Sequence, residues 1–418
     1  MNHPPRQPDD HDSFGIYRVA PDPAWPPPIP AAKRVDEKPA IPFAVPVDET
    51  DGLPLAIPVD DDIPVAHPAP PLRKRRPRRA LDAAPFVPGP NFAFALIWWV
   101  GFFVADLVLG LFIGIVLGVT KRNEDPIALF GIDQVFHLLM AGIVVAVMYR
   151  QFTRLNLGLG SVNPWHVFLV LLLLFPLHIV GAEAASWVVT LMQFLAKQMN
   201  LHFPLRGQDD VMEPLAEAGV PIMLLIIAVL PGVAEELFFR GFLGRGLVAR
   251  HGVVLGMACT TLFFAVMHIF PPQVCFTIVL GLGIHIVYLT TKSLWLAILL
   301  HIGNNTLACV MYLAAKNLQQ KVPWIGFWRE GNMHLPPLLV AASMAATGTL
   351  LWLFYANRMQ WIMPDGRVWS PGYVTAEIPP AAVGAEKQML LPDLHVAVSA
   401  LMAYVLFLGV LFWELGGR

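Results

Sequence analysis

Hydrophobic residues along this chain gather into long uncharged runs that begin after residue 90. Each run is close to the ~20 apolar residues that a helix needs to cross the ~30 Å hydrocarbon core of a bilayer. Such runs predict α-helices, because a helix satisfies its backbone hydrogen bonds internally where no water is present. We predict helices over residues 93–119, 131–149, 164–197, 220–250, 253–270, 273–290, 293–315, 335–355 and 391–414.

The predicted fold class is all-α, a polytopic membrane bundle of about eight to nine transmembrane helices over residues 90–418. The helix count stays open because the 164–197 run is long for one crossing and contains Pro176. This run forms either one tilted, kinked helix or two shorter pieces.

Composition supports the same class. Hydrophobic residues make up 56% of the 418 residues and charged residues 14%, whereas soluble domains are about 45–50% apolar and about 25% charged. An ordinary soluble protein is therefore excluded.

The cysteines Cys259, Cys275 and Cys309 all lie in apolar runs and form no CxxC pair. They predict buried small side chains rather than a disulfide framework or a thiolate metal site.

Residues 1–89 form a different region, which holds more than half of the 39 prolines and no long apolar run. Proline removes backbone donors and favours extended conformers, so this region predicts a disordered, partly polyproline-II tail. The tail ends in a basic run directly before the first span, made of Arg73, Lys74, Arg75, Arg76, Arg78 and Arg79. A nucleic-acid patch is the weaker interpretation, and no nucleic-acid partner is expected.

Basic residues beside a span favour the cytoplasmic side, where they contact anionic headgroups. We therefore expect a multi-pass protein of the inner (cytoplasmic) membrane with a cytoplasmic N-terminus. In that orientation one set of loop residues falls inside the cell, namely Arg150, Arg154, Arg245, Arg250 and His251. An acidic set falls outside, namely Asp209, Asp210 and Glu213.

Polar residues concentrate in three of the predicted spans. The 220–250 span carries Glu235, Glu236 and Arg240, the 253–270 span carries His268, and the 293–315 span carries His301, Asn304 and Asn305. An ionisable residue in mid-span costs roughly 2.5–3.5 kcal/mol on insertion scales, so such residues are usually paired and functional.

Spacing adds geometry to this group. Arg240 follows Glu236 by four residues, so the two share a helix face and can form an ion pair. Glu235 is turned about 100° away and has no cation at such spacing. His268 lies as far after a turn at His251 and Gly252 as Glu235 lies before it, about 25 Å in each case, so the two should be level across a helical hairpin.

Structural interpretations of the same residues stay open. Glu236 and Arg240 can be a purely structural pair, and His268 can be a packed histidine between helices. His301 and Asn305, four residues apart, can serve as hydrogen-bonding residues between helices. Pro231 and Gly232 predict either a helix loosened for water access or a packing kink. His285 has no partner at helical spacing, and we predict a structural role for it.

Three motifs occur in order on successive spans: EExxxR at 235–240, FxxxH at 264–268 and HxxxN at 301–305. Together they resemble the CAAX-protease and bacteriocin-processing (CPBP) family of intramembrane endopeptidases, which includes type II CAAX prenyl proteases and lysostaphin-resistance-protein-A-like members. The resemblance covers about residues 221–312.

The resemblance implies a bundle of about eight helices around a cavity open to one side of the membrane. It implies that Glu235 is the general base and that His268 helps to hold the attacking water. It also implies that His301 and Asn305 stabilise the oxyanion, with Glu236 and Arg240 in support. Carboxylate, imidazole and amide groups suit this chemistry, because each can move or share a proton or donate to developing charge.

The predicted function is therefore intramembrane cleavage of membrane-associated or lipidated proteins or peptides, with the bilayer and such substrates as partners. HExxH, GxGD and GxSG motifs are absent. No cofactor is preferred, although zinc held by Glu235, His268 and His301 is an alternative.

An alternative function is that of an inactive membrane protein that binds peptides or lipidated chains in an immunity or scaffold role. A proton-coupled transporter would show inverted repeats, which the sequence lacks.

Overall fold

The computed structural model describes residues 90–119, 126–147, 158–200, 209–326, 334–369 and 384–416. The predicted tail over residues 1–89, its basic run, and the loop arginines Arg150 and Arg154 lie outside the described residues.

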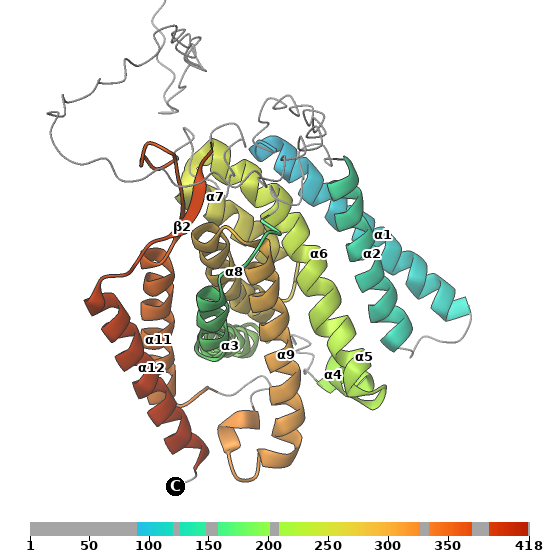
Figure 1. Cartoon of the computed structure of the whole chain (residues 1–418). Coiled ribbons are helices and arrows are strands. Elements are labelled where there is room, and N and C mark those ends of the chain that lie inside the picture. Colours follow the sequence, from blue (N-terminus) through green and yellow to red (C-terminus); the bar gives the residue numbers. More distant parts are fainter. Residues whose placement is uncertain are drawn as a thin grey trace, which may run out of the picture. The chain divides into compact units, whose positions relative to one another are not determined.

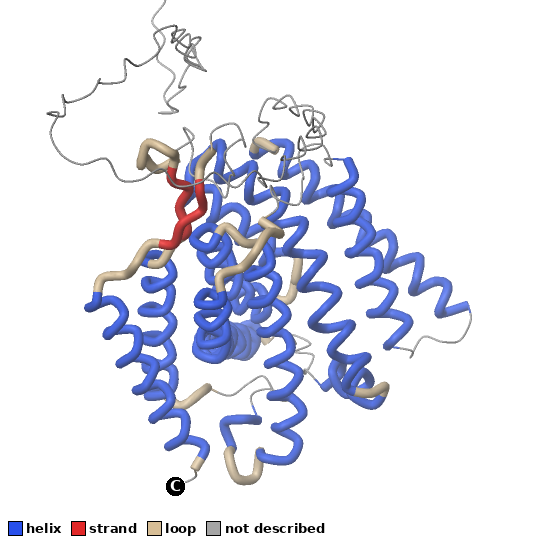
Figure 2. The backbone as a smooth tube through the Cα atoms, in the orientation of Figure 1, coloured by secondary structure: helices blue, strands red, loops and turns tan. Residues whose placement is uncertain are grey.

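Helices dominate the described part of the chain (Figures 1 and 2). The α-helices are α1 Phe92–Val119, α2 Pro126–Val147, α3 Pro164–Met199, α4 Asp209–Glu217, α5 Val220–Leu224, α6 Leu230–Phe238, α7 Arg245–Val266, α8 Pro271–Thr291, α9 Leu294–Leu318, α11 Pro337–Ala356 and α12 Leu394–Leu415. Two π-helical segments, η1 Leu225–Val229 and η2 Phe239–Gly244, flank α6, and the 3₁₀ turn η3 Pro323–Gly326 follows α9.

The predicted membrane bundle is confirmed. Within the described residues, seven stretches are long and apolar enough to cross a membrane: Phe92–Val116, Pro164–Met199, Val220–Val266, Pro271–Thr291, Leu294–Leu318, Pro337–Ala356 and Leu394–Leu415. A shorter apolar helix covers Gly131–Val144. The run whose form was left open is a single helix, because α3 continues for 36 residues through Pro176.

The 47-residue stretch Val220–Val266 contains the predicted helical hairpin. Gly252 has φ 80° and ψ 170°, so the chain turns there, at the predicted position. A Cβ on Gly256 would lie 2.5 Å from the backbone of Val248, so the two limbs of the hairpin pack backbone to backbone. Only glycine permits that approach.

Two short elements were not predicted. One is α4, in a segment expected to be a loop. The other is an antiparallel hairpin in which β1 Met359–Ile362 pairs with β2 Glu386–Met389, with Met359 opposite Met389. It lies between α11 and α12 in the sequence, beside the ends of the helices (Figure 1). Each strand has four residues, too few for alternation to stand out in the sequence.

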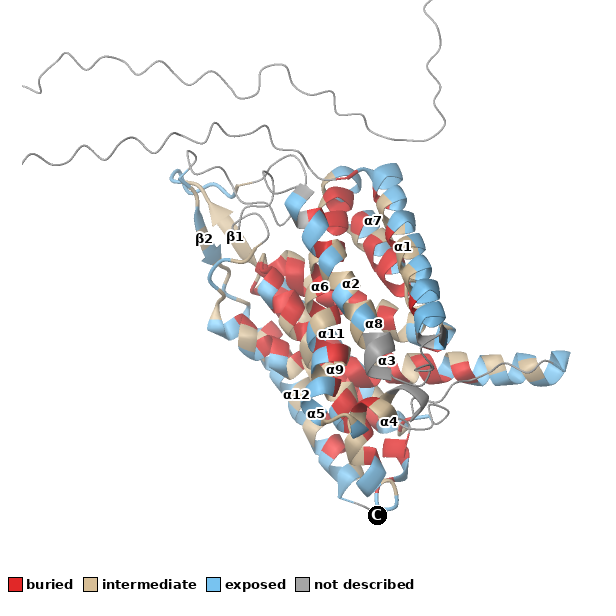
Figure 3. Cartoon of the chain, turned by 90° about the vertical axis from the view of Figure 1, so that its right-hand side faces the viewer, coloured by how far each residue is buried: buried red, intermediate tan, exposed pale blue. Residues whose placement is uncertain are grey.

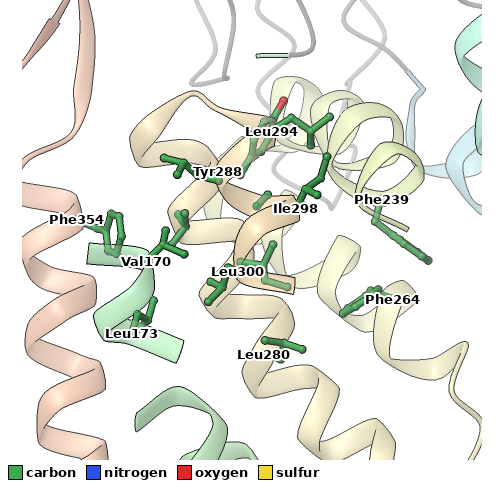
Figure 4. Close-up of a cluster of buried hydrophobic side chains, with 14 of the residues drawn as sticks. Val170, Leu173, Phe239, Phe264, Leu280, Tyr288, Leu294, Ile298, Leu300 and Phe354 are labelled. Atoms are coloured by element: carbon green, nitrogen blue, oxygen red, sulfur yellow. The ribbon is translucent and has the colours of Figure 1, made fainter. Parts of the chain in front are cut away.

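The main hydrophobic core lies where α3, η2, α7, α8, α9 and α11 meet. Figure 4 shows side chains from these segments converging, including Val170, Phe264, Leu280, Leu300 and Phe354. By contrast, α1 is largely exposed, with 11% of its span buried, as expected for a helix that faces lipid (Figure 3). The polar motif residues therefore lie on the central segments of the bundle.

Candidate functional site

A buried ion pair joins α6 to η2. Glu236 and Arg240 are both 0% exposed, and Arg240 Nη1 donates to Glu236 Oε1 over 2.8 Å. The other end of the guanidinium donates from Nη2 to the carbonyl of Gly281 in α8, at 3.0 Å. Its carbon lies 4.3 Å from the ring centroid of Phe264, in α7. The predicted ion pair is thus present, and its contacts hold α6, η2, α7 and α8 together.

His301, in α9, joins this ion pair. Its Nδ1 lies 2.8 Å from Glu236 Oε1, the same oxygen that accepts from Arg240. A carboxylate acceptor at Nδ1 assigns the proton of the neutral ring to that nitrogen and leaves Nε2 for another partner. The sequence grouped His301 with Asn305, four residues along the helix. Contact with Glu236 was not predicted, because sequence spacing does not show which helix faces are opposed.

Glu235 differs from its neighbour. Its Oε2 atom is buried and has no hydrogen-bond partner among the described residues. Glu236 Oε2 also has no hydrogen-bond partner among the described residues, but Glu236 Oε1 is within hydrogen-bond distance of both Arg240 and His301. As expected from helical spacing, Glu235 forms no ion pair among the described residues, although Arg240 lies near enough to interact with it electrostatically.

His268 lies close enough to Glu235 and His301 to interact with both electrostatically. Its Nδ1 lies 3.2 Å from the carbonyl of Phe264, so Nε2 is the nitrogen that remains for a water or substrate. The rings of His268 and His301 both pack edge-on against Phe264, with centroids 5.5 and 5.6 Å away. Phe264 therefore separates and orients the two histidines, a role that the FxxxH spacing alone did not indicate.

The prediction of a helix over 253–270 is wrong at its end, because α7 stops at Val266 and His268 lies in the following turn. Ile269 has φ 59°, a left-handed conformation that is unfavourable for a β-branched residue. Such strain costs about 1–3 kcal/mol and tends to persist at functional sites. Pro271 starts α8 and holds the residue before it, Phe270, in an extended conformation (φ −73°, ψ 117°), so helix cannot continue from α7 into α8 through this turn.

Asn305 contacts the backbone of the helix that carries Glu235. Pro231 has no N–H, so the carbonyl of Ile227, four residues earlier, loses its usual helical donor. Asn305 Nδ2 donates to that carbonyl over 3.0 Å. Ile227 lies in the π-helical segment η1, a distortion that is frequent near functional sites. The helix is thus distorted ahead of Pro231, and a Cβ on Gly232 would lie 2.6 Å from Ile302, which fits a packing kink as well as a loosened helix. Asn305 keeps one N–H for a further acceptor.

His178 is a neighbour that the sequence analysis missed. It lies in α3, where its Nδ1 is 2.9 Å from Asn304 Oδ1. Asn304 Nδ2 in turn donates to Asn305 Oδ1, at 3.3 Å. This chain of contacts orients the Asn305 amide. The available signal was a histidine two residues after Pro176, in the middle of an apolar run.

A metal site with three protein ligands needs their ligand atoms close to one another. Among the described residues, one group of His, Cys, Asp or Glu has all its ligand atoms within 4.8 Å, and it consists of Asp106, Asp133 and His137 on α1 and α2. Glu235, His268 and His301 do not form such a group. His301 has Nδ1 against Glu236 and keeps Nε2 for a ligand, so the zinc set considered from the sequence would need its side chains to move closer together.

His285, for which a structural role was predicted, is fully buried in α8. Neither of its ring nitrogens has a hydrogen-bond partner within the described chain.

The arrangement as a whole combines an unpaired carboxylate with two imidazoles and an amide. Glu235 and His268 can share a water, since each has an unbonded acceptor. His301 and Asn305 project from α9 towards the segment that carries Glu235. Such a group can activate water and donate to a negatively charged oxygen.

Residues 217–307 match the family described as Rce1-like, type II CAAX prenyl endopeptidase Rce1-like. The match is less than a quarter of the chain, and it contains all three motifs. No curated protein and no solved structure matches the chain.

The buried ion pair generates a stability prediction. Glu236→Ala leaves the Arg240 charge unpaired in apolar surroundings, and breaking a buried pair in this way costs roughly 3–5 kcal/mol. We expect a clearly lower thermal unfolding midpoint of the detergent-solubilised chain. Adding Arg240→Met should recover much of the loss. Glu217→Ala, at an exposed glutamate, is the control. An unchanged midpoint for Glu236→Ala would show that the pair does not stabilise the bundle.

Proposed function

Because the chain carries a domain of the Rce1-like type II CAAX prenyl endopeptidase family over residues 217–307, we propose that it hydrolyses peptide bonds of membrane-associated or lipidated proteins. Glu235 activates the attacking water, and the reaction takes place within the membrane bundle. The proposed catalysis is of the glutamate type, without a metal at Glu235.

The observation that carries this proposal is the difference between the two adjacent glutamates. Glu236 is engaged by Arg240 and His301 through one oxygen. Glu235 Oε2 has no partner in the described part of the molecule and lies near His268. A carboxylate oxygen without a hydrogen-bond partner is free to accept a proton from water, as a general base must. One glutamate is thereby structural and its neighbour is reactive.

The proposed reaction uses each group once. Glu235 takes a proton from a water that His268 helps to hold, and the water oxygen attacks the peptide carbonyl carbon. The resulting oxyanion accepts a hydrogen bond from Asn305 Nδ2, and His301 beside it contributes to its stabilisation. The C–N bond then breaks, and the proton held by Glu235 passes to the leaving nitrogen.

Glu235→Gln should abolish cleavage while leaving the unfolding midpoint near that of the wild type, because it removes the base but keeps the side-chain size. His268→Ala should behave alike. Asn305→Ala removes one oxyanion donor and should lower the rate about 10²–10³-fold. Cleavage of membrane peptides with and without a prenyl group, followed by mass spectrometry, measures these rates. Equal cleavage by Glu235→Gln and wild type would rule out Glu235 as the base.

Metal content separates the glutamate mechanism from the zinc alternative. Zinc held by Glu235, His268 and His301 would be lost from Glu235→Gln, since metal sites depend on each ligand. We expect equal zinc content in this variant and the wild type, measured by elemental analysis, and activity that survives chelators. Asp133→Asn is the matched control for zinc at Asp106, Asp133 and His137. Zinc that falls with Glu235→Gln alone and restores activity on return would establish a metallopeptidase.

We propose an inner-membrane location with the N-terminus and the mouth of the site facing the cytoplasm. The described chain supports this with the turn at Gly252 inside α7. There His251 packs against Phe92 at the start of α1, and Arg245 and Arg250 lie nearby in sequence. Basic residues beside spans favour the cytoplasm. Reporter fusions after Asp61 and Asp210 should report the cytoplasm and the opposite side, respectively. An extracytoplasmic signal at Asp61 would reverse the assignment.

A further inference from the structure

A small cavity lies away from the glutamate–histidine group, where the N-terminal ends of α3 and α9 meet the strand β2. Its volume is about 170 Å³, and its polar lining consists of Ser161, Asn163, His166, Thr291, Ser293 and Lys387. None of its lining residues is acidic. A drug-sized ligand needs roughly 300–1,000 Å³, so this cavity suits a small group.

Two features of the backbone give the cavity positive potential. The first is the start of α3, a helix of 36 residues, and the second is the start of α9, a helix of 25 residues. The N-terminus of a helix carries a partial positive charge and unpaired N–H groups, which favour anions. Asn163 caps α3 by accepting from Trp165 N over 2.9 Å. The equivalent residue of α9, Ser293, makes no capping hydrogen bond with its side chain.

Ser293 provides an independent sign of a ligand. It is 2% exposed, it lines the cavity, and its Oγ has no hydrogen-bond partner in the described structure. A buried hydroxyl without a partner costs about 1–3 kcal/mol, so such atoms usually have one. Ser293 lies at the N-cap position yet its hydroxyl is not used for capping. A bound group in the cavity would supply the missing acceptor.

Lys387 supplies a full positive charge. It is half-buried on β2, and no ion pair or hydrogen bond of its ammonium occurs within the described residues. Burial lowers the pKa of Lys387, and no nearby acidic group among the described residues offsets this effect. An anion in the cavity would offset it.

The shape of the cavity is fixed by close backbone contacts. Gly158 has φ +70°, and a Cβ there would lie 2.9 Å from the carbonyl of Lys292, so the loop before α3 lies directly against the turn before α9. Leu294 N donates to Gly158 O over 3.1 Å, and Asn163 Nδ2 lies 3.4 Å from the sulfur of Met389 on β2. The loop, α9 and the hairpin are therefore held in one arrangement before any ligand binds.

We propose that this cavity binds a phosphate group, held by Lys387, Ser293 and the N-terminal ends of α3 and α9. The cavity lies where apolar helices begin, which is the level of lipid headgroups, so an anionic phospholipid and free inorganic phosphate are the two sources of this chemistry. The hairpin β1–β2 then has a function, which is to bring a lysine over the ends of two membrane helices.

Binding can be measured on the full-length chain in neutral detergent, as the shift of its thermal unfolding midpoint with added ligand. The probes are short-chain phosphatidic acid and inorganic phosphate. We expect both to raise the midpoint of the wild type. Lys387→Gln should weaken the apparent affinity about tenfold or more, since one charge-assisted bond is lost. Ser293→Ala should weaken it less, and Lys387→Arg should retain binding.

The matched control is Lys321→Gln, which removes an exposed lysine after the far end of α9. Tighter binding of phosphatidic acid than of phosphate identifies a lipid headgroup, whereas equal affinities identify the phosphate itself. The proposal is overturned if neither probe shifts the wild-type midpoint, or if Lys387→Gln and Lys321→Gln bind both probes as the wild type does. Peptide cleavage is not part of this test, so its outcome does not depend on the proposed activity.

Discussion

The central constraint on this protein is that a charged group inside a membrane bundle needs a partner. Arg240 is fully buried, and its guanidinium contacts Glu236 through Nη1, the carbonyl of Gly281 through Nη2 and the face of Phe264, while its Nε has no hydrogen-bond partner in the described part of the chain. Each partner comes from a different segment, so the position of one arginine fixes how α6, α7 and α8 lie together. The contact of Glu236 with His301 extends the same network to α9.

The reactive part of the site follows from this network. Arg240 lies on the same helix face as Glu236, whereas Glu235 is turned about 100° around the helix. Glu235 therefore forms no ion pair with Arg240, although the two interact electrostatically, and it lies beside His268. Pro231, one turn before, frees the carbonyl of Ile227 that holds Asn305. A structural ion pair and a helix distortion thus position the groups to which we assign the chemistry.

Local sequence features predicted much of this. Apolar runs gave the spans, Gly252 gave the turn, and the spacing of Glu236 and Arg240 gave their ion pair. Contacts between helices could not be predicted in the same way. The partners His301 and His178 depend on which faces of α9 and α3 point inward, and that depends on packing throughout the bundle. The turn at His268 was missed because apolar residues continue past the end of α7.

The central claim is that Glu235 acts as a general base on water. It is tested most directly by a single turnover in ¹⁸O-labelled water, followed by mass spectrometry of the peptide product and of the protein. The account predicts label in the new carboxyl group of the product and none in the Glu235 side chain. Label in Glu235 after one turnover would mean that its carboxylate attacks the substrate and forms a covalent intermediate, which contradicts the account.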